Sequence, residues 1–411
     1  MEKLIEKFKR YVKIETTSID EEEIKQPSNP KEWDLLKLLD KELRELGIES
    51  TLSEKGYVYG LIKGNTIKEV PSLCFIAHID TSPDASGENV NPRIWENYDC
   101  RDLYLNDINK EEKPIILKLE DNPYLKECKG KTIITSDGRT LLGADDKAGV
   151  AEIMCMAEYL VNNPSFEHGD IYIVFTPDEE IGRGTENFDF EKCKAKFGYT
   201  VDGGTLGELE YENFNAGSMI CEFNGRTIHP GDAKNKMKNA IRIANEFDRM
   251  LPENMRPEYT ENYEGFFHLH NISGTVEFCK SEYLIREHDK NLFEKKKELA
   301  KKVGDYINLK YGDNTVKVII KDSYYNMSEI IKNNFHLITN AIEGMKKAGV
   351  CANVKPIRGG TDGARLSFMN LPCANLSTGG QNYHSRYEYA VLEDMEKMVE
   401  VILNIIGIYS K

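Results

Sequence analysis

Acidic and imidazole side chains follow several segments of this sequence that look like buried strands. His78 and Asp80 come after the apolar run SLCFIA, Glu179 and Glu180 come after IYIVF, and Asp202 comes after FGYTV. In open α/β sheets, ligands bind in the crevice beyond the carboxyl ends of the strands. We therefore expect these side chains to meet in one crevice.

We expect two further strand ends of the same domain to supply Asp145, after TIITSDGRTLLGA, and His384, in LSTGGQNYHSRYEY. Several carboxylates cannot share a cleft poor in water unless a cation balances them, because their repulsion would otherwise force protonation. Two histidines with three or more carboxylates suit borderline divalent metals, of which zinc is the first choice. Two metal ions need a ligand that bridges them, and we expect Asp145 in that place because small residues flank it.

The adjacent glutamates and the His-x-Asp pair have separate tasks in such a site. One of Glu179 and Glu180 can bind metal while the other acts as a base on metal-bound water, and the residue types alone leave open which is which. Asp80 stands two residues after His78, on the same side of a strand, and can accept from its ring N–H. Each feature alone is more common as ordinary surface structure. Their joint occurrence at strand ends favours a metal centre.

The segments that position these side chains alternate between helix and strand. Helical spacing of apolar residues marks 2–13 and 33–46, and strand-like runs occupy 57–62, 72–80 and 132–136. A helix beginning at DDKAG and the strands DIYIVFT and FGYTV follow. The alternation predicts an α/β domain with a mixed sheet covered by helices on both faces.

The pattern changes at about residue 217. The order becomes βαββαβ, with strands expected at SMICEFNGRTIH, NISGTVEFCK, EYLIREHD and TVKVIIKDSYY, and this order is that of the ferredoxin-like α+β unit. The α/β pattern then resumes. We therefore expect a discontinuous catalytic domain, 1–210 and 322–411, interrupted by an inserted domain, 211–321. Residues 84–130 are expected to be a long irregular excursion.

Composition excludes some classes of protein. The chain has 411 residues and a formal net charge of -15, so its field would repel a polyanion and disfavours nucleic-acid binding. The nine cysteines form no CxxC, which indicates reduced thiols in a cytoplasmic protein. The N-terminus lacks the apolar region of a signal peptide, and no apolar run is long enough to cross a bilayer, so we expect no membrane association.

Beyond single residues, the motifs TLLGADDKAGVAEIM, FTPDEEIGRGTENFD, TIHPGDAKNKMKNA, KPIRGGTDGARLSFMNLPCANLSTGG and YHSRYEY are informative together. Through them the chain resembles the M20 family of metallopeptidases along essentially its whole length, and within that family the tripeptide aminopeptidases. The resemblance implies two Zn²⁺ per subunit, with Co²⁺ or Mn²⁺ as alternatives. One ion would lie on His78, Asp145 and Asp202, and the other on Asp145, Glu180 and His384.

The same resemblance implies that Glu179 is the general base and acid and that Asp80 supports His78. It also implies that the inserted domain is a lid and a homodimerisation surface, whose His229 stabilises the oxyanion. A tripeptide substrate carries two charged ends, and arginine is the usual reader of a carboxylate. The residues we expect at the substrate are Arg286, Arg358 and Asn239 for the carboxylate end, and Asp178 for the amine.

Other functions are compatible with the same ligands. An N-acyl amino acid deacylase, a carboxypeptidase or a dipeptidase would keep the metal pair and change the bond that is cleaved. A zinc-dependent binding protein without turnover is disfavoured, because Glu179 and all five ligand positions are present.

Overall fold

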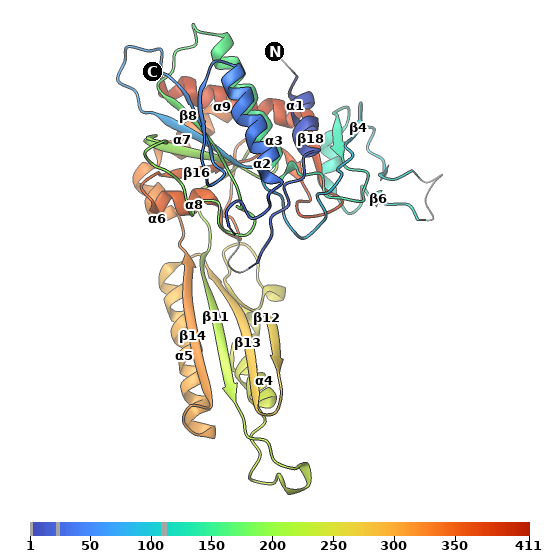
Figure 1. Ribbon diagram of the computed structural model, residues 1–411, viewed down its shortest axis with the longest axis vertical. Coiled ribbons are helices and arrows are strands. Elements are labelled where there is room, and N and C mark those ends of the chain that lie inside the picture. The colour runs from blue at the N-terminus through green and yellow to red at the C-terminus, as the bar shows by residue number, and fades with distance from the viewer. Residues whose placement is uncertain (1–2, 22–24, 108–112) are drawn as a thin grey trace. The chain divides into compact units, whose positions relative to one another are not determined.

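The computed structural model describes residues 3–21, 25–107 and 113–411. The chain forms two compact units, shown in Figure 1. Unit 1 comprises Met1–Tyr211, Ile330–Lys355 and Thr361–Lys411, and unit 2 comprises Glu212–Glu329 and Pro356–Gly360.

The inserted unit extends further than the predicted end at residue 321. Asn326 donates from its side chain to the carbonyl of His288 (3.1 Å), and its backbone N–H donates to Asn215 (3.0 Å). Its side-chain oxygen in turn accepts from the backbone N–H of Asn213 (3.1 Å). These bonds hold the chain beyond the last strand inside unit 2, so the predicted boundary is about eight residues too early.

The centre of unit 1 is a mixed sheet, as the sequence predicts, and it has eight strands. From edge to edge its strands are β1 (Glu49–Leu52), β2 (Val58–Ile62), β8 (Ile171–Thr176), β3 (Leu73–His78), β9 (Phe197–Val201), β16 (Cys373–Leu376), β10 (Glu208–Glu210) and β15 (Asn353–Val354). Neighbours among β8, β3, β9 and β16 are parallel. Their carboxyl ends therefore meet at one edge of the sheet.

Helices cover both faces of this sheet, and its middle strands β3, β8 and β9 are buried along their whole length, as in parallel sheets generally. On one face Tyr199 stacks on Phe75 and donates its hydroxyl to the carbonyl of Leu337 in α7. On the other face Cys74 shares a core with Leu366 of α8. The helices of unit 1 are α1 (Leu4–Val12), α2 (Glu32–Glu45), α3 (Ala144–Asn162), α7 (His336–Lys347), α8 (Asp362–Phe368) and α9 (Leu392–Tyr409), with short 3₁₀ turns η1 (Pro123–Cys128) and η5 (Lys332–Asn334). The short helix α6 (Ser328–Ile331) contains the point where the chain passes from unit 2 to unit 1.

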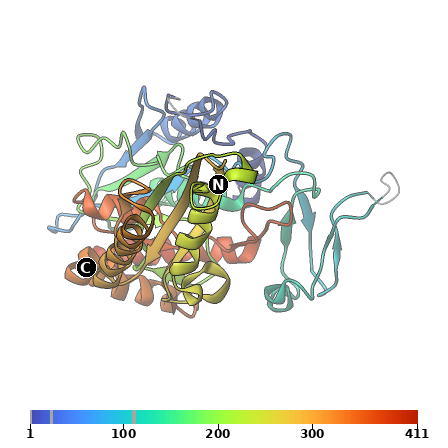
Figure 2. The same cartoon turned by 90° about the horizontal axis from the view of Figure 1, so that it is seen from below.

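Residues 84–107 and 113–130 form more regular structure than predicted. Their strand β4 (Arg93–Trp95) pairs with β7 (Ile133–Thr135), which pairs with β18 (Tyr389–Val391) and through it with β17 (Gly380–Gln381). A small hairpin of β5 (Leu103–Tyr104) and β6 (Ile116–Leu117) accompanies this sheet, and Figure 2 shows the segment in teal. The segment shares a core with β7 and β18, made of Tyr98, Leu103, Leu105, Leu117, Leu125, Cys128, Ile133, Tyr389 and Val391.

This second sheet corrects the expected origin of two site residues. The run 132–136 forms β7, which pairs with β18 rather than with the central sheet. Asp145 follows β7 at the start of α3, and His384 lies between β17 and β18. Both residues are therefore held by the small sheet and by α3, and not at the ends of central strands.

Unit 2 has the predicted βαββαβ order. Its elements are β11 (Asn215–Asn224), α4 (Ala240–Met250), β12 (Phe266–Gly274), β13 (Phe278–Glu287), α5 (Lys290–Tyr311) and β14 (Val316–Tyr324), with 3₁₀ turns η2 (Pro230–Asp232), η3 (Glu253–Met255) and η4 (Pro257–Tyr259). The strands are antiparallel in the order β12-β13-β11-β14. This is the ferredoxin-like arrangement.

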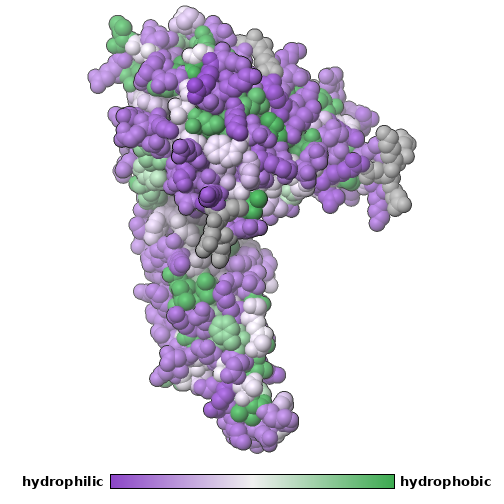
Figure 3. Space-filling view, in the orientation of Figure 1, coloured by the Kyte–Doolittle hydropathy of each residue, from purple (hydrophilic) through white to green (hydrophobic). Residues whose placement is uncertain are grey.

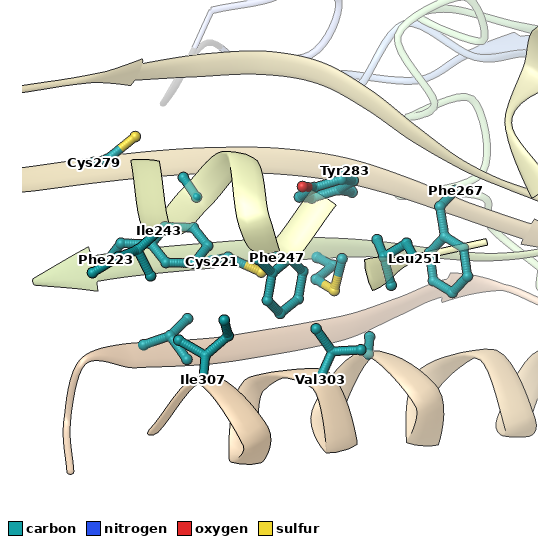
Figure 4. Packing of buried hydrophobic residues seen from close by; sticks show 14 of the residues in the cluster. Cys221, Phe223, Ile243, Phe247, Leu251, Phe267, Cys279, Tyr283, Val303 and Ile307 are labelled. Carbon is teal, nitrogen blue, oxygen red and sulfur yellow. The ribbon is translucent and has the colours of Figure 1, made fainter. Parts of the chain in front are cut away.

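One strand assignment within unit 2 is wrong. The stretch NISGTVEFCK is not a single strand but a hairpin, closed where the N–H of Thr275 donates to the carbonyl of Phe278 (2.6 Å). The preceding strand already begins at Phe266. Alternate residues of β11 and β13, such as Phe223 and Tyr283, face α4 and α5 and pack against Phe247 and Val303 (Figure 4).

The surface seen in Figure 3 is mostly hydrophilic over both units, which agrees with a chain in which 30% of the residues are charged. Within the described ranges, every helix is too short or too polar to span a lipid bilayer.

Candidate metal centre

Five predicted ligands come together at one end of unit 1. His78 is the last residue of β3, Glu180 follows β8 and Asp202 follows β9, so three parallel strands deliver them to the same edge. Asp145 lies in the first turn of α3, and His384 lies in the connection from β17 to β18. Residues separated by more than 300 positions in the sequence thus surround one small volume.

The distances divide the five residues into two groups that share Asp145. One carboxylate oxygen of Asp145, Oδ1, lies 2.9 Å from His78 Nε2, and the other, Oδ2, lies 3.4 Å from His384 Nε2. Asp202 Oδ1 lies 3.8 Å from His78 Nε2, and Glu180 Oε2 lies 2.9 Å from His384 Nε2. Asp145 therefore presents one oxygen to each group, which is the arrangement that a bridging carboxylate needs.

Asp146 is a further acidic residue at this centre, and sequence reasoning passed over it. Ligand atoms of His78, Asp146 and Asp202 lie within 4.8 Å of one another, as do those of His78, Asp145 and Glu180. Asp146 is buried, and its Oδ2 accepts a hydrogen bond from the backbone N–H of His78 (3.2 Å). The doubled aspartate in GADDKAG was the signal that could have identified it.

The carboxylates at the centre need a positive charge to balance them. Burial raises the pKa of the Asp202 carboxyl most, and the nearby negative charge of Asp145 raises it further. Hydrogen bonds with Asp145 and Glu180 raise the pKa of His384 to about 11. Without a cation the histidines thus take up protons to balance the carboxylates, and a divalent ion would replace those protons.

An unsatisfied acceptor points to the same conclusion. Glu180 Oε1 is buried and has no hydrogen-bond partner among the described residues. A buried carboxylate oxygen without a partner is costly, and coordination to a metal ion would remove that cost. The set of two imidazole nitrogens and several carboxylate oxygens fits a pair of divalent ions.

Asp80 contacts His78, as predicted, and makes further contacts that the sequence did not predict. Its Oδ1 lies 3.3 Å from His78 Nδ1, although the backbone carbonyl of Asp80 is nearer, at 3.1 Å. The carboxylate also accepts hydrogen bonds from the backbone N–H groups of Glu179 (3.0 Å) and Glu180 (3.1 Å) and from the hydroxyl of Ser18. One buried side chain thereby orients a histidine and both adjacent glutamates.

Glu179 differs from its neighbour Glu180 in its contacts. Glu180 faces His384, whereas the Glu179 side chain makes no ion pair with a histidine in the described chain. Burial raises the pKa of the Glu179 carboxyl, and the nearby charge of His78 opposes the rise only in part. A carboxyl with a raised pKa beside a metal centre suits proton transfer near neutral pH.

Asp178 does not fit the expected role of reading a substrate amine. Its side chain is fully buried, and both oxygens accept from the backbone N–H of Ser28 (2.9 and 3.0 Å). The buried Glu32 lies beside it, and burial raises the pKa of Glu32 to about 10. Asp178 therefore fixes the loop before α2, and that expectation was wrong.

His229, Asn239 and Arg286 belong to unit 2, so their role at the metal centre stays a prediction. His229 is exposed and accepts from the N–H of Gly231 through Nδ1 (3.2 Å). Asn239 is the N-cap of α4 and accepts from the N–H of Arg242 (3.2 Å). Arg286 stacks over the ring of Tyr324 and donates to two backbone carbonyls of its own sheet.

Arg358 is engaged inside unit 2. Its guanidinium donates to the carbonyls of Asn262 (2.7 Å), Glu264 (3.0 Å) and Thr260 (3.3 Å), and it stacks over Phe214. These contacts give it a structural task in holding the loop before β12. A substrate carboxylate would have to displace them, so Arg286 is the better candidate reader.

Comparison with known proteins agrees with this geometry. Residues 211–315 match the peptidase dimerisation domain of the M20 family. Two relatives named peptidase T, from Caldanaerobacter subterraneus and Alkaliphilus oremlandii, are each 52% identical to this chain, and each match covers 100% of both proteins.

Solved structures show the same fold. The aminopeptidase PepT from Bacillus cereus aligns with a TM-score of 0.79 at 22% identity, over 100% of this chain and 98% of that one. A dinuclear metal-binding peptidase of the M20 family from Bacillus subtilis aligns with a TM-score of 0.66 at 15% identity, over 98% and 97%. With 52% identity to its relatives over the full length, the chain belongs to the peptidase T family of M20 metallopeptidases.

Proposed function

We propose that this chain is an aminopeptidase that releases the N-terminal residue of tripeptides with two Zn²⁺ per subunit. The main observation behind the proposal is that the Asp145 carboxylate has one oxygen toward His78 and the other toward His384. His78, Asp145 and Asp202 would hold one ion, and Asp145, Glu180 and His384 would hold the other. The same donors would also accept Co²⁺ or Mn²⁺.

In this proposal the residues of unit 1 have different roles in the reaction. When bound, the metal ions supply a Lewis acid for the scissile carbonyl and lower the pKa of a water molecule toward neutrality. Glu179 takes a proton from that water onto its carboxylate, and then gives it to the nitrogen of the leaving amine. Asp80 keeps Glu179 in place through the backbone N–H of that residue.

Unit 2 completes the site in this proposal. His229 donates to the oxyanion that forms at the scissile carbonyl. Arg286, with lesser contributions from Asn239 and Arg358, binds the substrate carboxylate, and closure of unit 2 as a lid excludes water. The match to the dimerisation domain supports a homodimer formed through unit 2. All nine cysteines are free thiols, which supports a reducing, cytoplasmic location.

The substrate preference is tested with a small set of compounds. We expect kcat/KM to be highest for a free tripeptide, and lower for the amidated tripeptide, for dipeptides and for N-acetyl amino acids. Arg286→Ala should reduce the preference for the free carboxylate, whereas Arg249→Ala, on the last turn of α4, should leave it unchanged. Equal kcat/KM for free and amidated peptides would discard carboxylate recognition.

The same assay separates the rival functions. Preference for N-acetyl amino acids would identify a deacylase, and release of the C-terminal residue would identify a carboxypeptidase. Binding of peptide with no turnover by the metal-loaded chain would identify a binding protein.

Removal of metal by a chelator should lower the thermal unfolding midpoint. This decrease in midpoint should be larger at higher pH. In the metal-free chain the pKa of His384 is raised to about 11, from about 6.5 in an unfolded chain. The stability that this proton confers is complete below about pH 6.5 and is lost progressively as the pH rises toward 11. Bound metal replaces the proton, so the loaded protein does not share this loss.

Melting curves at two pH values check this expectation. The difference in midpoint between loaded and metal-free protein should be larger at about pH 8.5 than at about pH 6.5. A difference that stays constant or narrows as the pH rises would contradict it.

A further inference from the structure

Glu388 is a buried acid beside the metal centre that no step of the proposed reaction uses. Its side chain is 1% exposed, and it lies four residues after His384, just before β18. Its Oε2 accepts from the backbone N–H groups of Leu142 (2.8 Å) and Gly143 (2.7 Å). Its Oε1 accepts from the backbone N–H of Asp145 itself (2.9 Å).

These three N–H groups belong to the turn that leads into α3. Gly143 has the left-handed φ of 82°, and the helix has no side-chain cap at this residue. N–H groups at a helix start have no partner within the helix, and when buried they need one from outside. The Glu388 carboxylate supplies that partner through charge-assisted hydrogen bonds, so one side chain fixes the turn that carries Asp145.

The same side chain joins this turn to the segment that carries the second histidine. Glu388 and His384 lie in one short connection between β17 and β18, and His384 Nε2 lies 3.4 Å from Asp145 Oδ2. The backbone of Asp145 and the short connection that carries His384 are thus linked through one buried carboxylate. A shift of either segment would move one oxygen of Asp145 away from its group of ligands.

We infer that Glu388 is a positioning residue that holds the Asp145 carboxylate between the two metal sites. The inference rests on the proposed function, in which Asp145 bridges the ions. A purely structural role would affect the stability of the fold without changing how tightly the ions bind. Metal affinity therefore distinguishes the two roles.

Glu388→Gln and a matched variant, Glu393→Gln, test the inference. Glutamine keeps the size of the side chain but replaces one acceptor oxygen with an NH₂ group that faces a backbone donor. Glu393 also accepts a hydrogen bond from a backbone N–H group, that of Thr132 (2.8 Å), which directly precedes β7 in the chain. Within the described chain, Glu393 contacts none of the proposed ligands. Glu393→Gln can keep its single backbone bond through the amide oxygen, whereas Glu388→Gln places an NH₂ group against a backbone donor at the turn of Asp145.

The metal-free proteins are titrated with Co²⁺, and binding is followed by calorimetry and by the visible absorption of the ion. We expect Glu388→Gln to bind the pair of ions about 10- to 100-fold more weakly than wild type and to show an altered spectrum. Glu393→Gln should bind like wild type. In tripeptide hydrolysis at saturating metal, kcat should fall for Glu388→Gln while KM changes little.

The outcomes separate this inference from the proposed function. Wild-type protein that binds fewer than two Co²⁺ would contradict the proposed function itself. Two ions bound by wild type and equally tightly by Glu388→Gln would overturn the inference alone. If Glu388→Gln does not fold, Glu388→Asp keeps the charge but cannot reach all three N–H groups, and unchanged Co²⁺ binding by that variant would overturn the inference.

Discussion

Glu179→Gln should lower kcat by about 10²- to 10⁴-fold while leaving the bound metal unchanged. Glutamine fills the same volume, but it cannot accept the proton of the attacking water or return it to the leaving amine. The backbone N–H of residue 179 would still donate to Asp80, so the neighbouring Glu180 should stay oriented. KM should change little, because Glu179 has no part in holding the substrate.

Steady-state rates with a tripeptide and metal analysis of the same samples measure this effect. Glu186→Gln is the matched control, since Glu186 lies on the same loop and pairs with Arg183 at the surface. We expect wild-type rates from this control. Activity of Glu179→Gln within a few-fold of wild type would show that the base lies elsewhere, and loss of metal would show that Glu179 is a ligand.

Asp145→Asn should abolish activity and remove both metal ions rather than one. Each oxygen of Asp145 faces a different histidine, so neutralising this carboxylate weakens both sites together. A variant of Asp202 or Glu180, by contrast, should affect mainly the ion that it would bind. Loss of both ions from a single substitution is the signature of a bridging ligand.

Asp146→Asn is the informative comparison. Asparagine can still accept the N–H of His78 through its side-chain oxygen, so the local structure should hold. We expect this variant to keep two ions by elemental analysis. If Asp146→Asn loses metal while Asp145→Asn keeps it, the ligand is Asp146, as the alternative group of His78, Asp146 and Asp202 would require.

The parts of the site that the sequence could predict are those that depend on local patterns. Buried parallel strands appear as continuous apolar runs, so the residues that follow them can be placed at one edge without coordinates. This holds for His78, Glu180 and Asp202, which follow β3, β8 and β9. The βαββαβ order of unit 2 could be read in the same way, from changes in the period of the apolar residues.

The parts that escaped prediction depend on contacts between distant segments. The sheet of β17, β18, β7 and β4 joins residues almost 300 positions apart through strands of two or three residues, which are too short for any period to show. The tasks of Asp178 and Arg358 follow from their backbone partners in other loops. Glu388 could not be predicted for the same reason. Its partners are backbone N–H groups, and the sequence does not show which backbone groups a side chain will bind.

The central claim is that two metal ions share the carboxylate of Asp145. Anomalous diffraction at the zinc edge, from crystals grown with Zn²⁺, tests it most directly. The predicted result is two peaks about 3.5–4 Å apart on either side of Asp145, one beside His78 and Asp202 and the other beside Glu180 and His384. A single peak, or a pair of peaks out of reach of Asp145, would contradict the claim.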